Sequence, residues 1–191
     1  HRIVPLSQET LFYRAYFHYR TEDYKNALTL FNEALDENPY NVPAFVVRSY
    51  CLLKLEKFEE AIAFLENMPE DIVIQDERLG LLCLAYILKR DKTGTEKYLE
   101  RLRQEAQKPS SFQAHSYLFV AYACMKKNDE AFSWLAHAIK LKSSVLLLNF
   151  SDPLANSLKS DPRYKKYIQE LYHQTEIPVK KTSTKPPLLV N

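Results

Sequence analysis

The stretch DYKNALTLFNEALDENPYN (23–41) decides the fold once it is compared with KFEEAIAFLENMPEDIV (57–73). The apolar anchors of the first stretch return after 34 residues in the second: Tyr24 as Phe58, Ala27 as Ala61, Phe31 as Leu65 and Ala34 as Met68. Self-similarity at a fixed period is the sequence signature of a repeat architecture. One supersecondary unit is therefore present at least twice.

Helical spacing of apolar residues runs through both parts of each unit. In the first unit these residues are Leu11, Ala15 and Tyr19, then Tyr24, Ala27, Leu28, Phe31, Ala34 and Leu35. The short connection RTEDY (20–24) between the two helices predicts an antiparallel hairpin, and Pro39 lies beyond the last turn of its second helix. The next hairpin is predicted over 42–55 and 58–67.

Two further hairpins are predicted from a less regular apolar pattern. The third is predicted at about 75–89 and 95–107, and the fourth within FQAHSYLFVAYACMKKNDEAFSWLAHAIKLKS (112–143). There Ala131, Leu135 and Ala138 repeat the spacing of the anchors in the first hairpin. Four hairpins are thus expected over residues 7–142, with an undisturbed 34-residue register only between the first two.

The run Ala27, Phe31, Ala34, Pro39 and the cluster Leu82, Cys83, Tyr86 resemble the tetratricopeptide repeat, whose pattern is W-x2-L-G-x2-Y, then A-x3-F, then P. No repeat here has the Trp or the Gly of that pattern. The resemblance implies an all-α fold, a right-handed α-α superhelix of about four helical hairpins plus a C-terminal capping helix.

The stretch SDPLANSLKSDPRYKKYI (151–168) resembles the terminal segment of many bacterial repeat arrays. Asp161 is predicted as the N-cap and Pro162 as the first residue of a helix over 161–172. Its apolar face is expected to cover the end of the stack, with Trp134 packed against it. Residues 143–172 are accordingly predicted to be a connecting segment and a capping helix.

The two ends of the sequence differ from the repeats. Residues 1–6 are expected to be a lead-in, and His1 in place of Met predicts a fragment of a longer protein. EIPVKKTSTKPPLLVN (176–191) has three prolines, three lysines and no helical period, so 173–191 is predicted to be a linker. Its layout is similar to the tether that joins a repeat region to a DNA-binding domain in some bacterial cytoplasmic regulators.

Composition excludes several function classes. Only Gly80 and Gly94 are glycines, which rules out glycine-rich phosphate loops. The net charge of +2 is spread over mixed acidic and basic residues, so direct nucleic-acid binding is not expected, even at YRAYFHYR (13–20), whose arginines are diluted by neighbouring acids. No apolar run approaches the roughly 20 residues of a membrane span. Three widely spaced cysteines predict a reducing, cytoplasmic compartment, with Cys51 and Cys83 in the core.

Catalytic chemistry is not expected either. The five histidines lie in separate units without metal-ligand spacing, so neither a metal nor another cofactor is predicted. The carboxylates lie on polar helical faces beside lysines, where solvation and ion pairing explain them. The chain is therefore predicted not to be an enzyme.

In the family that the sequence resembles, the first helix of each hairpin lines a concave groove. Carried onto this sequence, the groove positions are Phe12, Tyr16, Tyr19, Val46, Tyr50, Leu53, Leu84 and Ile87. Where the chaperone-adaptor members hold a carboxylate with Lys, Asn and Arg, this chain has Phe12, Tyr16 and Val47, so a chaperone tail is not the expected ligand. An apolar groove suits a partner helix or a hydrophobic peptide.

Two functions remain open at this point. The first is an interaction module of a bacterial cytoplasmic protein, such as a transcriptional regulator, that binds a protein, a peptide or a second copy of itself. The second is a structural spacer or dimerisation segment whose groove is filled by its own side chains, by the N-terminal residues or by residues 145–150. Accessible Tyr16, Tyr50 and Leu53 would favour the first function, and their burial by residues 1–6 or 173–191 would favour the second.

Overall fold

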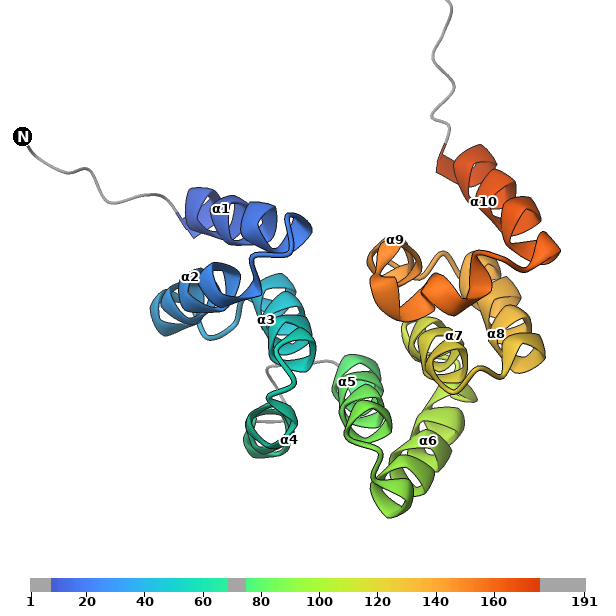
Figure 1. The fold of residues 1–191 in the computed structure, drawn as a ribbon, viewed down its shortest axis with the longest axis horizontal. Helices are drawn as coiled ribbons and strands as arrows, with labels where there is room; N and C mark the ends of the chain where they lie inside the picture. Colours follow the sequence, from blue (N-terminus) through green and yellow to red (C-terminus); the bar gives the residue numbers. More distant parts are fainter. Residues whose placement is uncertain (1–7, 69–74, 176–191) are drawn as a thin grey trace, which may run out of the picture. The chain divides into compact units, whose positions relative to one another are not determined.

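The computed structural model describes residues 8–68 and 75–175, and every regular element in these ranges is a helix. Four successive antiparallel pairs are α1 (Gln8–Arg20) with α2 (Tyr24–Glu37), α3 (Val42–Lys54) with α4 (Phe58–Asn67), α5 (Gln75–Lys89) with α6 (Lys92–Ala106), and α7 (Ala114–Cys124) with α8 (Asn128–Lys140) (Figure 1). The short helices α9 (Leu146–Ser151) and η1 (Pro153–Leu158) follow, and then α10 (Pro162–Thr175). The predicted all-α solenoid is confirmed.

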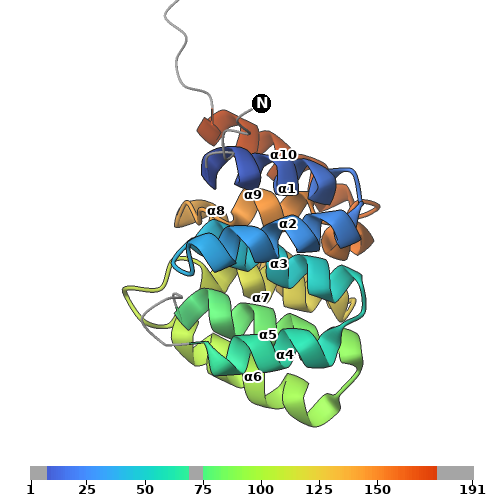
Figure 2. The same ribbon diagram turned by 90° about the vertical axis from the view of Figure 1, so that its left-hand side faces the viewer.

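Two compact units make up the chain: the first ends at Leu158 and the second begins at Lys159. Within the first unit each helix packs on its hairpin partner, and α1 also packs on α3, α3 on α5 and α5 on α7 (Figure 2). The repeated anchors form the core of this stack, because Ala27, Phe31, Ala61 and Leu65 are all fully buried. Small residues let the helix axes approach, and the large residues fill the space between them.

The tight turn between the two helices of each hairpin has the same backbone conformation in all four hairpins, although the helix sequences differ. Glu22, Glu56, Arg90 and Lys126 occupy it with φ angles of 62°, 57°, 63° and 59°. The residue after each of them donates its N–H to a carbonyl five residues back, as Lys57 does to Leu52 at 2.9 Å, which is the bond that ends a Schellman-type helix terminus. The left-handed turn is thus made in every hairpin without glycine.

These turns correct one sequence prediction. The 34-residue register was expected to stop after the second hairpin, but Glu22, Glu56 and Arg90 keep it through the third. Helix α6 accordingly begins at Lys92, about three residues earlier than predicted, because the Asp91 carboxylate accepts a hydrogen bond from the Gly94 N–H at 2.9 Å and caps the helix. The register is lost only in the longer connection between α6 and α7.

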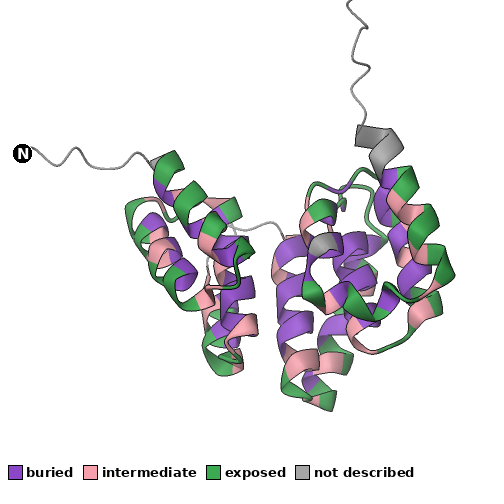
Figure 3. Ribbon diagram, turned by 45° about the horizontal axis from the view of Figure 1, so that its top comes forward, coloured by how far each residue is buried: buried purple, intermediate pink, exposed green. Residues whose placement is uncertain are grey.

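Helix α7 is buried on all sides: every residue from Ala114 to Ala123 is buried (Figure 3). Such a helix must be covered all round, and α5, α6, α8, α9 and η1 all pack on it. The contact with α5 is close, since a Cβ added at Gly80 would lie 2.1 Å from the fully buried ring of Tyr117.

The second unit contains α10. The helix begins at Pro162 as predicted and continues to Thr175. The Asp161 carboxylate accepts hydrogen bonds from the backbone N–H of Arg163 at 3.0 Å and from its guanidinium at 2.7 Å, which lower the pKa of Asp161 to about 2. Its role as a cap stays a prediction, and the predicted lead-in (1–6) and residues 176–191 of the linker lie outside the described residues.

Several side chains named above can now be placed. Cys51 and Cys83 are fully buried, as predicted, and Cys124 is partly buried; all three are free thiols. The rings in contact with Trp134 are those of His115 and His137, at 5.6 and 5.8 Å between ring centroids. Among the described residues no helix is both long enough and apolar enough to cross a membrane.

Candidate interaction surface

Residues 143–158, which were predicted to connect the repeats to a cap, lie along α7. The ring of Phe150 contacts that of Phe119 at 6.0 Å, and Leu146, Ala155 and Leu158 are buried. The Ser157 hydroxyl donates to the carbonyl of Ala123 at 3.0 Å. This segment therefore supplies the apolar cover that α7 requires on the side not covered by its neighbours in the stack.

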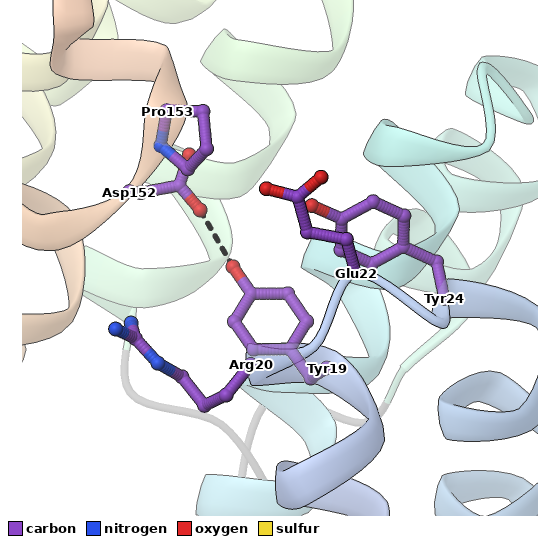
Figure 4. Close-up of a pocket in the computed structure, with 6 residues that line it drawn as sticks. All are labelled: Tyr19, Arg20, Glu22, Tyr24, Asp152 and Pro153. Atoms are coloured by element: carbon purple, nitrogen blue, oxygen red, sulfur yellow. Dashed lines mark hydrogen bonds between the residues drawn. The ribbon is translucent and has the colours of Figure 1, made fainter.

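Polar side chains of the same segment reach the first two hairpins. Tyr19 of α1 donates its hydroxyl to Asp152 Oδ2 at 2.6 Å (Figure 4). Lys54 of α3 donates to Asp152 Oδ1 at 2.5 Å. The Asp152 side chain is only 1% exposed. Since a buried carboxylate is costly unless it is paired and hydrogen-bonded, Asp152 fixes the position of both α1 and α3 against this segment.

Asn149, which belongs to α9, has a similar role. The hydroxyl of Tyr50 in α3 donates to Asn149 Oδ1, and Asn149 Nδ2 donates to the hydroxyl of Ser116 in α7 at 2.9 Å. We define the inner face as the side of α1, α3 and α7 that carries Tyr19, Tyr50 and Ser116. Residues 149–152 thus bond to all three of these helices.

The electrostatics agree with these donor assignments. Burial raises the pKa of Tyr19 far above its ordinary value, and the negative charge of Asp152 raises it further. Burial likewise raises the pKa of Tyr50. Both phenols therefore stay protonated and donate. A small hollow of about 90 Å³ remains beside the pair, lined by Tyr19, Arg20, Glu22, Tyr24, Asp152 and Pro153 (Figure 4).

The start of the segment is held at the N-terminal end of α7. Gln113 Oε1 accepts from the Ser143 hydroxyl at 2.6 Å, and Gln113 Nε2 donates to the Ser144 hydroxyl at 2.6 Å. Gln113 is positioned in turn by Asp76 of α5, whose Oδ2 accepts from the backbone N–H groups of Gln113 and Ala114 at 2.8 and 3.2 Å. A carboxylate from a neighbouring hairpin therefore satisfies the free N–H groups of α7.

Comparison with known proteins agrees with this geometry. The family model for subunit 3 of the anaphase-promoting complex, or cyclosome, matches residues 2–68. The crystal structure of a thermophilic tetratricopeptide-repeat protein from Thermus thermophilus superimposes with a TM-score of 0.57 at 23% sequence identity, covering 88% of this chain and 92% of that one. This chain has the tetratricopeptide-repeat fold. None of the curated proteins matches the sequence significantly.

The eight groove residues carried over from the tetratricopeptide-repeat pattern divide into two groups. The side chains of Tyr19, Val46, Tyr50, Leu53 and Leu84 are buried, whereas those of Phe12, Tyr16 and Ile87 are partly exposed. Phe12 and Tyr16 stack on each other at 6.1 Å on α1. The structure brings Tyr19 and Tyr50 together with the chain's own residues 149–152, and the binding role of all eight stays a prediction.

Asn149, Asp152 and Lys54 were not singled out from the tetratricopeptide-repeat pattern. The segment from Val145 to Phe150 was predicted as one cover for the groove, without naming the residues that would bond to the repeats. The polar residues Asn149 and Asp152 within the largely apolar stretch VLLLNFSDPL (145–154) were the available signal.

Proposed function

We propose that this tetratricopeptide-repeat chain is a non-enzymatic protein–protein interaction module. The observation that carries the proposal is the pair Phe12 and Tyr16 on α1, two stacked and partly exposed aromatic side chains. Partly exposed aromatic residues next to a hydrophobic core are the usual anchors of protein interfaces. The stacked helices of the fold supply a rigid support for them.

The proposal includes a division of the inner face. Its centre, with Tyr19 and Tyr50, is bonded to residues 149–152 and serves to close the first unit, which corresponds to the structural role given above as the alternative. The partly exposed pair Phe12 and Tyr16 on α1 is left to a peptide, helix or domain of a partner, and Ile87 on α5 stays a separate candidate position. The association with a bacterial cytoplasmic regulator rests on the layout of residues 151–191 alone and is kept as part of the proposal.

Helix α1 offers matched controls for a test. Phe12 and Tyr16 have counterparts of the same residue types in Phe17 and Tyr13, which are 65% and 66% exposed on the same helix. The full chain and its alanine variants would be cross-linked in extract of the source cells, and the captured proteins quantified by mass spectrometry. We expect Phe12→Ala and Tyr16→Ala to lose a partner that Phe17→Ala and Tyr13→Ala retain. Equal capture by all four variants would contradict the assignment.

Self-association is a second candidate, because Tyr13 and Phe17 lie four residues apart and expose two large rings on one side of α1. Light scattering over a wide concentration range would report the solution mass relative to the 22.4 kDa of one chain. A dimer that Phe17→Ala dissociates would assign this surface to a second copy of the chain. A monomer at every concentration would reject self-association.

A further inference from the structure

A larger cleft lies in the first unit between α3, α5, the N-terminal end of α7 and the start of α9. Its volume is about 410 Å³, and its walls are largely aliphatic, with Val42, Val46 and Val47 on one side and Val145 and Leu148 on another. Clefts of roughly 300–1,000 Å³ with apolar walls and a few polar groups are typical binding sites. The principal polar group here is the carboxyl of Glu77.

Glu77 lacks the partners that its neighbour has. It is 4% exposed, and within the described part of the chain its Oε2 has no hydrogen-bond partner. Asp76, by contrast, accepts three hydrogen bonds, from Ser111, Gln113 and Ala114. A buried carboxyl oxygen without a donor is unusual in a native protein and marks a place where a ligand, ion or water belongs.

The basic side chains of the surrounding helices are engaged elsewhere. Arg48 donates to Asn32 at 2.6 Å, Lys54 to Asp152 at 2.5 Å, and Arg78 to the carbonyl of Glu66 at 2.7 Å. Burial raises the pKa of Glu77 to about 7, and the negative charge of Asp76 contributes to the rise. The cleft therefore combines apolar walls with an acid that no cation of the described chain neutralises.

Three other buried polar atoms have no hydrogen-bond partner among the described residues: the hydroxyl of Tyr117 and Nδ1 of His115, both on α7, and Nη1 of Arg48 on α3. Of the four residues concerned, Glu77 is the one that lines the cleft. Around Tyr19 and Tyr50, in contrast, residues 149–152 satisfy the buried hydroxyls.

We propose that this cleft binds a lysine side chain of a protein partner. The four methylenes of the lysine lie against Val46, Val47 and Leu148, and its ammonium group donates to Glu77. A lysine fits better than an arginine because a single unpartnered oxygen suits a point charge, whereas a guanidinium fork is best satisfied by two acceptors. This inference rests on the proposed function, whose partner it describes by chemistry.

A small probe tests the site without the partner. The ¹⁵N-labelled full chain would be titrated at pH 8 with n-butylammonium chloride, which reproduces the lysine side chain, and separately with n-butanol, its neutral counterpart. We expect saturable shifts of the amide signals of Val46, Val47 and Glu77 with the ammonium ion, and binding of the alcohol weaker by about tenfold or more. Glu77→Gln should weaken ammonium binding by a similar factor.

A matched control is Glu59→Gln on α4, whose side chain is 77% exposed and which should bind the probe as the unaltered chain does. Equal affinity for amine and alcohol, or unchanged binding in Glu77→Gln, would overturn the lysine assignment. So would the absence of saturable shifts at the cleft, as expected if it holds water alone. The comparison of the two probes uses the unaltered chain, so it stands even where a variant fails to fold. Because no partner protein is involved, a negative result leaves the proposed function intact.

Discussion

Two buried tyrosines, one in α3 and one in α7, have opposite surroundings. Tyr50 and Tyr117 are both fully buried. The hydroxyl of Tyr50 donates to Asn149, while that of Tyr117 has no partner among the described residues. Tyr117 instead presses its ring against Gly80, and the unpaired Oε2 of Glu77 belongs to the same helix as that glycine. Asn149 thus satisfies the hydroxyl of Tyr50, whereas the described residues leave the hydroxyl of Tyr117 without a partner.

The difference shows that the repeats alone do not satisfy the polar groups of the inner face. The acceptor for Tyr50 lies 99 residues further along the chain, and the acceptor for Tyr19 lies 133 residues away. The buried hydroxyls of Tyr19 and Tyr50 are hydrogen-bonded to Asp152 and Asn149. Between α3, α5 and α7 the helices leave a cleft of about 410 Å³ instead. The packed repeats form the inner face, and residues 149–152, which belong to no repeat, cover one region of it and leave the cleft uncovered.

The largest effect is expected from Tyr50→Ala. The substitution removes a fully buried aromatic side chain and the bond to Asn149, so the free energy of unfolding should fall by about 3–5 kcal/mol. Urea denaturation measures this, with Tyr16→Ala as the control, since a partly exposed side chain should cost about 1 kcal/mol. If Tyr50 were instead a free groove residue, its alanine variant would be as stable as the Tyr16 variant.

Gly80→Ala should come next. A Cβ at this position would lie 2.1 Å from a ring that is buried on all sides and cannot move aside, so we expect a loss of about 3 kcal/mol from overpacking. Gly94→Ala is the matched control: its Cβ would also lie 2.1 Å from a ring, that of Tyr86, but this ring is only partly buried, so we expect a smaller loss than at Gly80. The gain in helix propensity of up to about 1 kcal/mol then offsets the cost. Equal losses in thermal unfolding would refute the contrast.

Glu77→Gln should change the pH dependence of stability. Burial and Asp76 raise the pKa of Glu77 from 4.5 to about 7 in the folded chain, so the folded form holds this proton more tightly than the unfolded form. Its contribution to stability is complete below about pH 4.5 and is lost as the pH rises through 7. The glutamine variant should therefore match the unaltered chain at pH 4 and exceed its unfolding free energy by about 2 kcal/mol at pH 8. Urea denaturation at several pH values gives the difference, and a constant offset would exclude this titration.

The smallest changes in unfolding free energy are expected from removing the hydroxyl of Tyr50 or of Tyr117, and they compare the two tyrosines most directly. Tyr50→Phe leaves Asn149 Oδ1 without its donor and should cost about 1–2 kcal/mol. Tyr117→Phe removes a hydroxyl for which the described residues provide no partner, and it should be neutral or stabilising by up to about 1 kcal/mol. Guanidinium unfolding of both variants is sufficient. A loss in Tyr117→Phe as large as that in Tyr50→Phe would mean that a bound water serves the second hydroxyl.

The sequence predicts most of the fold because the evidence for it is local. Apolar spacing placed α3, α4 and α5 within one residue of their observed ends. Helix α6 began earlier than predicted because its first turn is polar and its start depends on the Asp91 cap. Asp152 could not be identified as a buried ion-pair partner of Lys54, since the two residues lie 98 positions apart and meet only in the folded chain. The cleft at Glu77 depends in the same way on three helices and a loop meeting.

The glycine-free turns have an electrostatic consequence along one edge of the first unit, where the hairpin turns follow one another (Figure 2). Their left-handed positions are filled in chain order by Glu22, Glu56, Arg90 and Lys126, all with exposed or partly exposed side chains. At these four positions the side chain is acidic in the first two hairpins and basic in the last two. Salt screens exposed charges over about 8 Å at physiological ionic strength, so each of them acts mainly on a molecule bound at its own turn.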